Sequence, residues 1–161
     1  MYNGALDVIQ EACRGYELDY LTEPDSRIED RIAKADLVIT FGRGILESLA
    51  SGKNVISCDK RTGWMDKAQG AGMITEDNFD LYKTHAFSGR NRPTEFTVER
   101  LREELKKYDP NRNLRHRILE DFNIKKTTKE YLNIYERHLS GEIPKASRTQ
   151  EENNRNQSRI M

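Results

Sequence analysis

The residues best suited to chemistry lie together between positions 42 and 47. Gly42 and Gly44 flank Arg43, and Glu47 follows about one helical turn later. Glycine adopts backbone angles that other residues avoid and lets another molecule approach the main chain. An arginine binds phosphate through paired, charge-assisted hydrogen bonds, and a carboxylate accepts hydrogen bonds from vicinal sugar hydroxyls. A phosphate beside a sugar indicates a nucleotide.

The segments on either side predict how these residues are held. Residues 37–41 are apolar and partly β-branched, which is typical of a strand buried on both faces in a parallel sheet. Residues 45–51 have helix-forming composition and end at Gly52, and residues 54–58 resemble a second strand. In such a βαβ unit the helix begins at the carboxyl end of the first strand, where unpaired N–H groups favour an anion.

A purely structural interpretation competes with this one. Glycine turns between a strand and a helix are common in α/β folds, and this pattern matches neither a P-loop nor the GxGxxG dinucleotide motif. A glutamate in the first turn of a helix is stabilising through the helix dipole alone, and an exposed arginine is ordinarily solvated. Spacing alone therefore favours a turn without a ligand.

Residues 35–80 resemble the nucleotide-sugar-binding part of the C-terminal domain of GT-B-fold glycosyltransferases. The shared features are an apolar strand with an aspartate, a glycine turn, and a helix with a Glu-x-x-Ala-x-Gly core, here Glu47 to Gly52. Residues 72–79 and 87–90 are similar to the next segments of some members, so that the likeness covers roughly residues 15–90. The resemblance implies an α/β fold with a Rossmann-like parallel sheet flanked by helices, one half of a GT-B fold, and a helical C-terminal part.

The resemblance also implies roles for individual residues. In this interpretation Glu47 binds the ribose hydroxyls, the turn from Gly42 to Ile45 receives the diphosphate, and the loop with Leu21 and Thr22 faces the nucleobase. An ordinary role in a solvated loop, or for the single tryptophan in covering the core, remains open for the loop residues. The residues expected around the donor sugar or the acceptor are Arg61, Gly63, Trp64 and Arg90.

Two departures limit what the resemblance implies. Many members that retain the anomeric configuration of the sugar carry a second glutamate at the position that Ile39 occupies here. The sequence therefore does not assign the chain to the retaining or the inverting enzymes. At 161 residues the chain is long enough for one of the two GT-B halves. The resemblance therefore implies that any general base comes from another domain or chain, as the N-terminal half usually contributes it in this family, and we assign no catalytic residue.

The predicted function is that of a donor-binding domain, which binds a nucleotide-diphosphate sugar for transfer of a glycosyl group, of the hexosyltransferase type, to an acceptor. UDP is favoured by its frequency in the family. The alternative is a non-catalytic module for nucleotide binding or protein association, derived from such an enzyme. A flavodoxin-like or receiver-like domain is a third class, but the sequence has no flavin site and no acidic phosphoacceptor cluster.

Composition excludes several other classes. The formal net charge is zero, which argues against a general nucleic-acid binder. No apolar run reaches transmembrane length. Cys13 and Cys58 lack metal-site spacing and are expected to be buried, reduced thiols. The three histidines are scattered along the chain. We expect a cytoplasmic protein that binds no metal and no cofactor besides its substrate, in a possible homo-oligomer.

The rest of the chain has simpler signals. Residues 1–140 are predicted to form the domain and residues 141–161 a polar, disordered tail. Ser26, Thr75 and Thr127 are predicted to cap helices. The further elements predicted are a helix over residues 5–13, strands over 17–21 and 70–75, and helices over 26–34, 76–82, 97–108 and 114–122, and from 127 onward.

Overall fold

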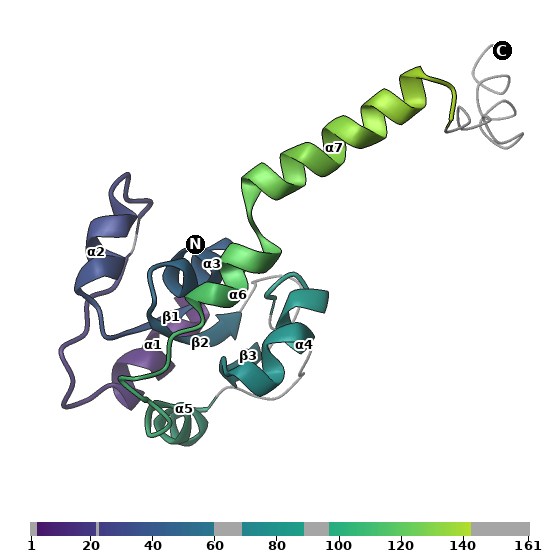
Figure 1. Ribbon diagram of the computed structural model, residues 1–161. Helices are drawn as coiled ribbons and strands as arrows, with labels where there is room; N and C mark the ends of the chain where they lie inside the picture. The colour runs from purple at the N-terminus through teal and green to yellow at the C-terminus, as the bar shows by residue number, and fades with distance from the viewer. Residues whose placement is uncertain (1–2, 22, 60–68, 89–96, 143–161) are drawn as a thin grey trace, which may run out of the picture. The chain divides into compact units, whose positions relative to one another are not determined.

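The computed structural model describes residues 3–21, 23–59, 69–88 and 97–142. Its contacts divide the chain into two units, Met1–Asp121 and Phe122–Met161. The first unit contains a small sheet with helices around it (Figure 1). In chain order the elements are α1 (Asn3–Ala12), α2 (Ile28–Lys34), β1 (Leu37–Thr40), α3 (Arg43–Ala50), β2 (Asn54–Asp59), β3 (Gln69–Met73), the 3-10 helix η1 (Glu76–Asn78), α4 (Phe79–Thr84), α5 (Val98–Leu105), α6 (Arg115–Asp121) and α7 (Ile124–Leu139).

The sheet is mixed, with strand order β1-β2-β3. β1 pairs with β2 in parallel, as the βαβ pattern predicts, with Val38 opposite Val55. β3 is antiparallel to β2, with Ile56 opposite Met73, so the prediction of a wholly parallel sheet is wrong. Only nine residues separate β2 from β3, and a parallel crossover needs a dozen or more. The chain is therefore an α/β protein with a small mixed sheet.

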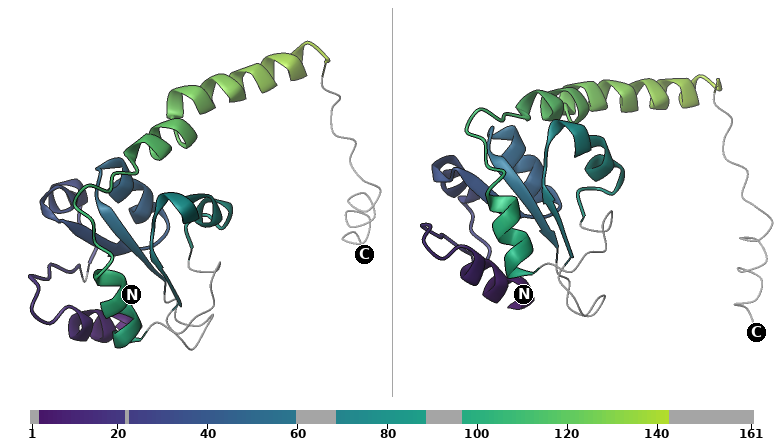
Figure 2. Two further views of the ribbon diagram at one scale, coloured as in Figure 1. Left: turned by 60° about the horizontal axis from the view of Figure 1, so that its bottom comes forward. Right: turned by 90° about the horizontal axis from the view of Figure 1, so that it is seen from below.

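Neighbouring residues of β2 point to opposite faces of the sheet and enter different cores. Val55 packs with Ile45 and Leu49 of α3 in one cluster, to which α4 and α6 also contribute. Ile56 packs with Ala12 and Leu101 in another, between the sheet and the helices α1 and α5. Those two helices lie beside each other in both views of Figure 2. Because successive side chains of a strand point to opposite faces, β2 contributes to both cores and the sheet separates them.

Several local predictions are wrong. Residues 17–21 are not a strand, and the side chains of β1 are half-buried, since β1 is the edge of the described sheet. α2 begins after Arg27 without a side-chain cap, and the N–H of Arg27 donates to Asp25 Oδ1 (2.9 Å), so Ser26 is not the cap. α7 begins at Ile124, where Asn123 rather than Thr127 provides the cap.

Other predictions are confirmed. Gly52 ends α3 with a φ of 74°, and Thr75 precedes η1, its N–H donating to Asn78 Oδ1 (2.8 Å). Cys13 and Cys58 are both buried, as predicted, and burial raises the pKa of the Cys13 thiol. In the described ranges no helix is long and apolar enough to span a membrane. The predicted tail lies outside the described residues from residue 143 onward.

Candidate functional site

The N-terminus of α3 comes directly after the carboxyl end of β1. Gly42 precedes the helix with φ 59° and ψ −127°, a conformation that requires glycine. The helix begins at Arg43, two residues earlier than predicted, so Gly44 lies inside it. Helix geometry leaves the N–H groups of its first residues without intrahelical acceptors. The N–H groups of Arg43 and Gly44 are therefore the main-chain donors at this position.

The N–H of Gly42 already has a partner. It donates to the carbonyl oxygen of Phe87 at 2.8 Å. Ala86 and Phe87 both have a φ of 52°, in the left-handed region, and the buried ring of Phe87 packs edge-on against Phe79 with 5.5 Å between centroids. The turn after α4 thus fixes the Gly42 turn. The sequence carries no signal for this contact, since bulky residues rarely adopt this conformation.

Gly44 is needed for packing rather than for the approach of a ligand. A Cβ atom at this position would lie 2.5 Å from Thr40 Oγ1, the last residue of β1. Within the helix, the hydroxyl of Ser48 donates to the Gly44 carbonyl (2.7 Å). The glycine lets α3 cross closely over the end of β1, and this places the first turn of the helix at the edge of the sheet.

Arg43 and Glu47 form an ion pair on the first turns of α3. Arg43 Nε donates to Glu47 Oε1 at 3.1 Å, with 89% of the arginine side chain and 40% of the glutamate side chain exposed. In the described part of the chain this is the one hydrogen bond of either side chain. The terminal nitrogens of Arg43 and Oε2 of Glu47 therefore remain available to another molecule.

The other predicted site residues are distributed differently. Ile45 is fully buried and its N–H donates to the Gly42 carbonyl (3.1 Å), so it belongs to the core. Leu21 is exposed and lines a separate surface hollow of about 350 Å³, which includes none of the α3 residues. The residues that lie outside the described ranges are Thr22, Arg61, Gly63, Trp64 and Arg90.

Sequence reasoning also missed Ser57, which pairs in register with Thr40 at the carboxyl end of the parallel strands. The side chain of Ser57 is fully buried, and its hydroxyl has no hydrogen-bond partner among the described residues. Because Val55 lies two residues earlier in β2 and packs on α3, Ser57 is on the same face of the sheet. A serine in a strand gives no signal of such a position.

A second charged cluster surrounds Glu104 of α5. Its side chain is 2% exposed, and Oε2 accepts the N–H of Met73 (2.9 Å) at the outer edge of β3. Oε1 lies 2.7 Å from Lys107 Nζ and 2.8 Å from an Arg100 terminal nitrogen. Burial acts to raise the pKa of Glu104, but the hydrogen bonds from Lys107 and Met73 and the two positive charges together lower it. This cluster closes the sheet edge.

Comparison of the chain with known protein families, with curated proteins and with solved structures finds no match. The arrangement of the residues themselves therefore carries the functional argument.

Proposed function

We propose that the start of α3 binds the diphosphate of a nucleotide sugar, and that the domain is a reduced Rossmann-like donor half of a GT-B glycosyltransferase. The observation that carries the proposal is the exposed Arg43–Glu47 pair on a helix that starts at the carboxyl end of a parallel strand. Helix N-termini at this edge of α/β sheets are the usual place for phosphate groups. The sequence resemblance adds the nucleotide sugar to this general expectation.

The two side chains have complementary roles in the proposal. The free terminal nitrogens of Arg43 and the N–H groups of Arg43 and Gly44 hold the diphosphate. Oε2 of Glu47 accepts a ribose hydroxyl. Their mutual ion pair pre-organises both groups without using up their remaining hydrogen-bonding capacity. In glycosyl transfer the diphosphate leaves with growing negative charge, which these donors stabilise.

Calorimetric titration of the chain with UDP, GDP and their sugar conjugates tests the proposal. Glu47→Gln keeps the shape of the side chain but removes its charge, and should weaken binding by about 1.5–3 kcal/mol. Glu29→Gln is the matched control, because Glu29 is an exposed glutamate in the first turn of a different helix, α2. No binding at millimolar ligand, or a Glu47 variant that binds ribo- and 2′-deoxyribonucleotides with the same affinities as the unaltered chain, would overturn the assignment.

The alternative of a non-catalytic module shares this binding site and differs in what the complex does. If the domain is a donor half, adding the N-terminal half of such an enzyme should restore transfer of sugar to an acceptor. If nucleotide binds and no partner half supports transfer, the module without catalysis is the better description.

A further inference from the structure

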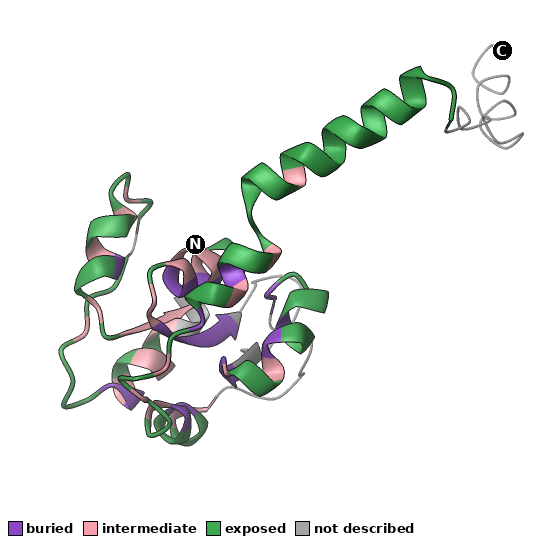
Figure 3. Ribbon diagram, in the orientation of Figure 1, coloured by how far each residue is buried: buried purple, intermediate pink, exposed green. Residues whose placement is uncertain are grey.

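One face of α7 is apolar and exposed. The helix has 16 residues, none of which is buried, and Figure 3 shows almost all of this helix as exposed. Six large apolar side chains are spaced so that they fall on one side. Their exposed fractions range from 49% to 85%, and they are Ile124, Tyr131, Leu132, Ile134, Tyr135 and Leu139.

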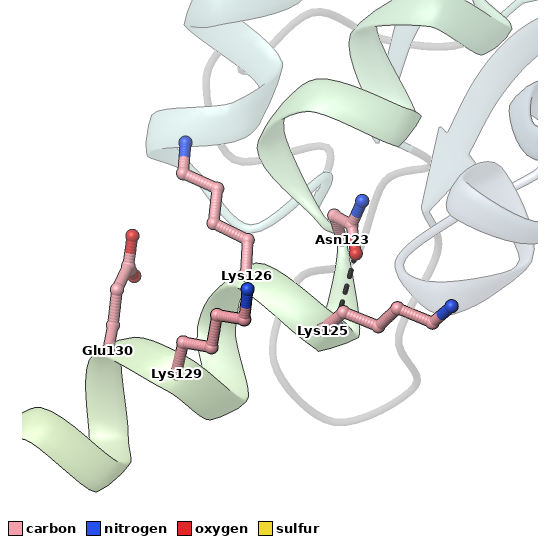
Figure 4. A pocket seen from close by; sticks show the side chains of 5 residues that line it. All are labelled: Asn123, Lys125, Lys126, Lys129 and Glu130. Carbon is pink, nitrogen blue, oxygen red and sulfur yellow. Dashed lines mark hydrogen bonds between the residues drawn. The ribbon is translucent and has the colours of Figure 1, made fainter.

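The other side of α7 is basic near its start. Asn123 Oδ1 accepts the N–H of Lys125 (3.0 Å) and begins the helix. The side chains of Lys125, Lys126 and Lys129, together with Glu130, line a shallow hollow of about 370 Å³ (Figure 4). In the described part of the chain none of the three lysines forms a salt bridge. Three cations therefore share the hollow with one carboxylate, which leaves an excess of positive charge there.

Charge is divided unequally between the two units. Residues 122–161 contain eight lysines and arginines and five acidic residues. Residues 1–121 contain 19 basic and 22 acidic residues, so the two net charges have opposite signs although the whole chain is neutral. The unit with the apolar helix is thus the positively charged one.

The shape of the apolar face does not suit a coiled coil with a second copy. At 100° per residue, the apolar face extends around the helix from Ile134 to Leu132, over about 160°. This is wider than the narrow stripe formed by the a and d positions of a coiled coil. The apolar face also contains three polar residues, Thr127, Thr128 and His138. Sixteen residues also amount to little more than two heptads, fewer than a coiled coil needs.

We propose that α7 binds the surface of an anionic lipid bilayer, lying in the plane of the interface. A wide apolar face opposite unpaired lysines is the pattern of interfacial amphipathic helices. The two tyrosines at the centre of the face have an apolar ring and a polar tip, which suits the headgroup boundary. The lysines at the start of the helix contact anionic headgroups, and the acidic first unit stays off the surface. This proposal is independent of nucleotide binding.

Sedimentation of the full chain with lipid vesicles tests the proposal. The chain should bind vesicles of phosphatidylcholine with phosphatidylglycerol, bind pure phosphatidylcholine much more weakly, and dissociate as salt is added. Lys125→Glu with Lys129→Glu should weaken binding roughly a hundredfold. Lys34→Glu with Lys106→Glu makes the same change in net charge on exposed lysines of the first unit, and should leave binding nearly unchanged.

The apolar face is tested separately. Tyr131→Ser with Tyr135→Ser should reduce binding to anionic vesicles by more than about tenfold, whereas Asn133→Ser on the opposite side should not. Three results would overturn the proposal. The first is no binding of the unaltered chain to vesicles. The second is a dimer in light scattering that the tyrosine substitutions abolish, and the third is a loss of thermal stability of the first unit in the tyrosine variant. Either of these last two results would mean that the apolar face packs against protein.

Discussion

Glu104 and Glu47 are both helical glutamates paired with basic residues close in sequence, yet their surroundings are opposite. Glu104 is buried, and both of its oxygens are occupied by an N–H of β3 and by two cations. Glu47 is partly exposed and uses one oxygen, in a pair with an arginine that is 89% exposed. A saturated carboxylate stabilises the fold, whereas one with a free oxygen can bind another molecule. The comparison separates structural charge from functional charge.

Removing Glu104 should give the largest effect. Glu104→Ala leaves the buried N–H of Met73 without an acceptor, which costs about 1–3 kcal/mol. Arg100 and Lys107 are about half exposed and regain water. We expect a loss of about 2–3 kcal/mol in the free energy of unfolding, below the 3–5 kcal/mol typical of a fully buried pair. Denaturant titration measures it.

Glu103→Ala is the matched control for this substitution. Glu103 precedes Glu104 in α5, is largely exposed, and lies 3.8 Å from Arg100 in a weak pair. Its removal should change the free energy of unfolding by less than about 0.5 kcal/mol. A similar cost for both glutamates would contradict the role of Glu104 at the edge of β3.

Acid should diminish the contribution of Glu104. Its pKa is lowered from the ordinary value of 4.5 in the folded chain. A group with a depressed folded pKa contributes stability above its unfolded pKa, and this contribution is lost as pH falls through the folded value. The difference in stability between the unaltered chain and Glu104→Ala should therefore be constant at neutral pH and shrink below about pH 4.5. A difference that grows in acid would contradict the assignment.

The comparison also shows which parts of the fold the sequence could predict. The β1–α3–β2 unit was predictable because apolar runs and Gly52 give local signals for its strands and helix end. The sequence predicts a strand over residues 17–21, but no strand among the described residues pairs with that segment. A strand needs a hydrogen-bonded neighbouring strand, and the sequence pattern within a segment does not show whether such a neighbour exists.

Contacts across the chain were not predictable. Glu104 has the same sequence context as the exposed glutamates beside it. It is buried because Gly72 has no side chain, since a Cβ there would lie 2.8 Å from Glu104 Cδ. The partner of Gly42 is likewise a main-chain carbonyl 45 residues away, at Phe87. For the candidate site, the sequence indicated the exposed residues Arg43 and Glu47, but not the groups that hold their turn in place.

Gly44 provides the next test, with an effect of intermediate size. An alanine in a helix is favoured over glycine by about 1 kcal/mol, but here its Cβ would lie 2.5 Å from Thr40 Oγ1. We expect the clash to dominate, so that Gly44→Ala lowers the free energy of unfolding by about 1 kcal/mol.

Thr40→Ala removes the clashing atoms and serves as the second arm of a double-mutant cycle. In this background Gly44→Ala should become neutral or stabilising, because only the helix propensity remains. If the cost of Gly44→Ala is unchanged without the threonine side chain, the packing role assigned to Gly44 is wrong.

Glu47→Gln should have the smallest effect on stability. The pair with Arg43 is solvent-exposed, and such pairs contribute about 0–1 kcal/mol. The carboxylate also lies on the second turn of α3 from a helix start at Arg43, where the dipole contribution is small. We therefore expect a change of about 0.5 kcal/mol or less by denaturant titration, which high salt should reduce further. A loss as large as that of Glu104→Ala would mean that Glu47 is a structural carboxylate, and would remove the distinction on which the nucleotide proposal depends. A small loss of stability together with a large loss of nucleotide affinity is the result that supports it.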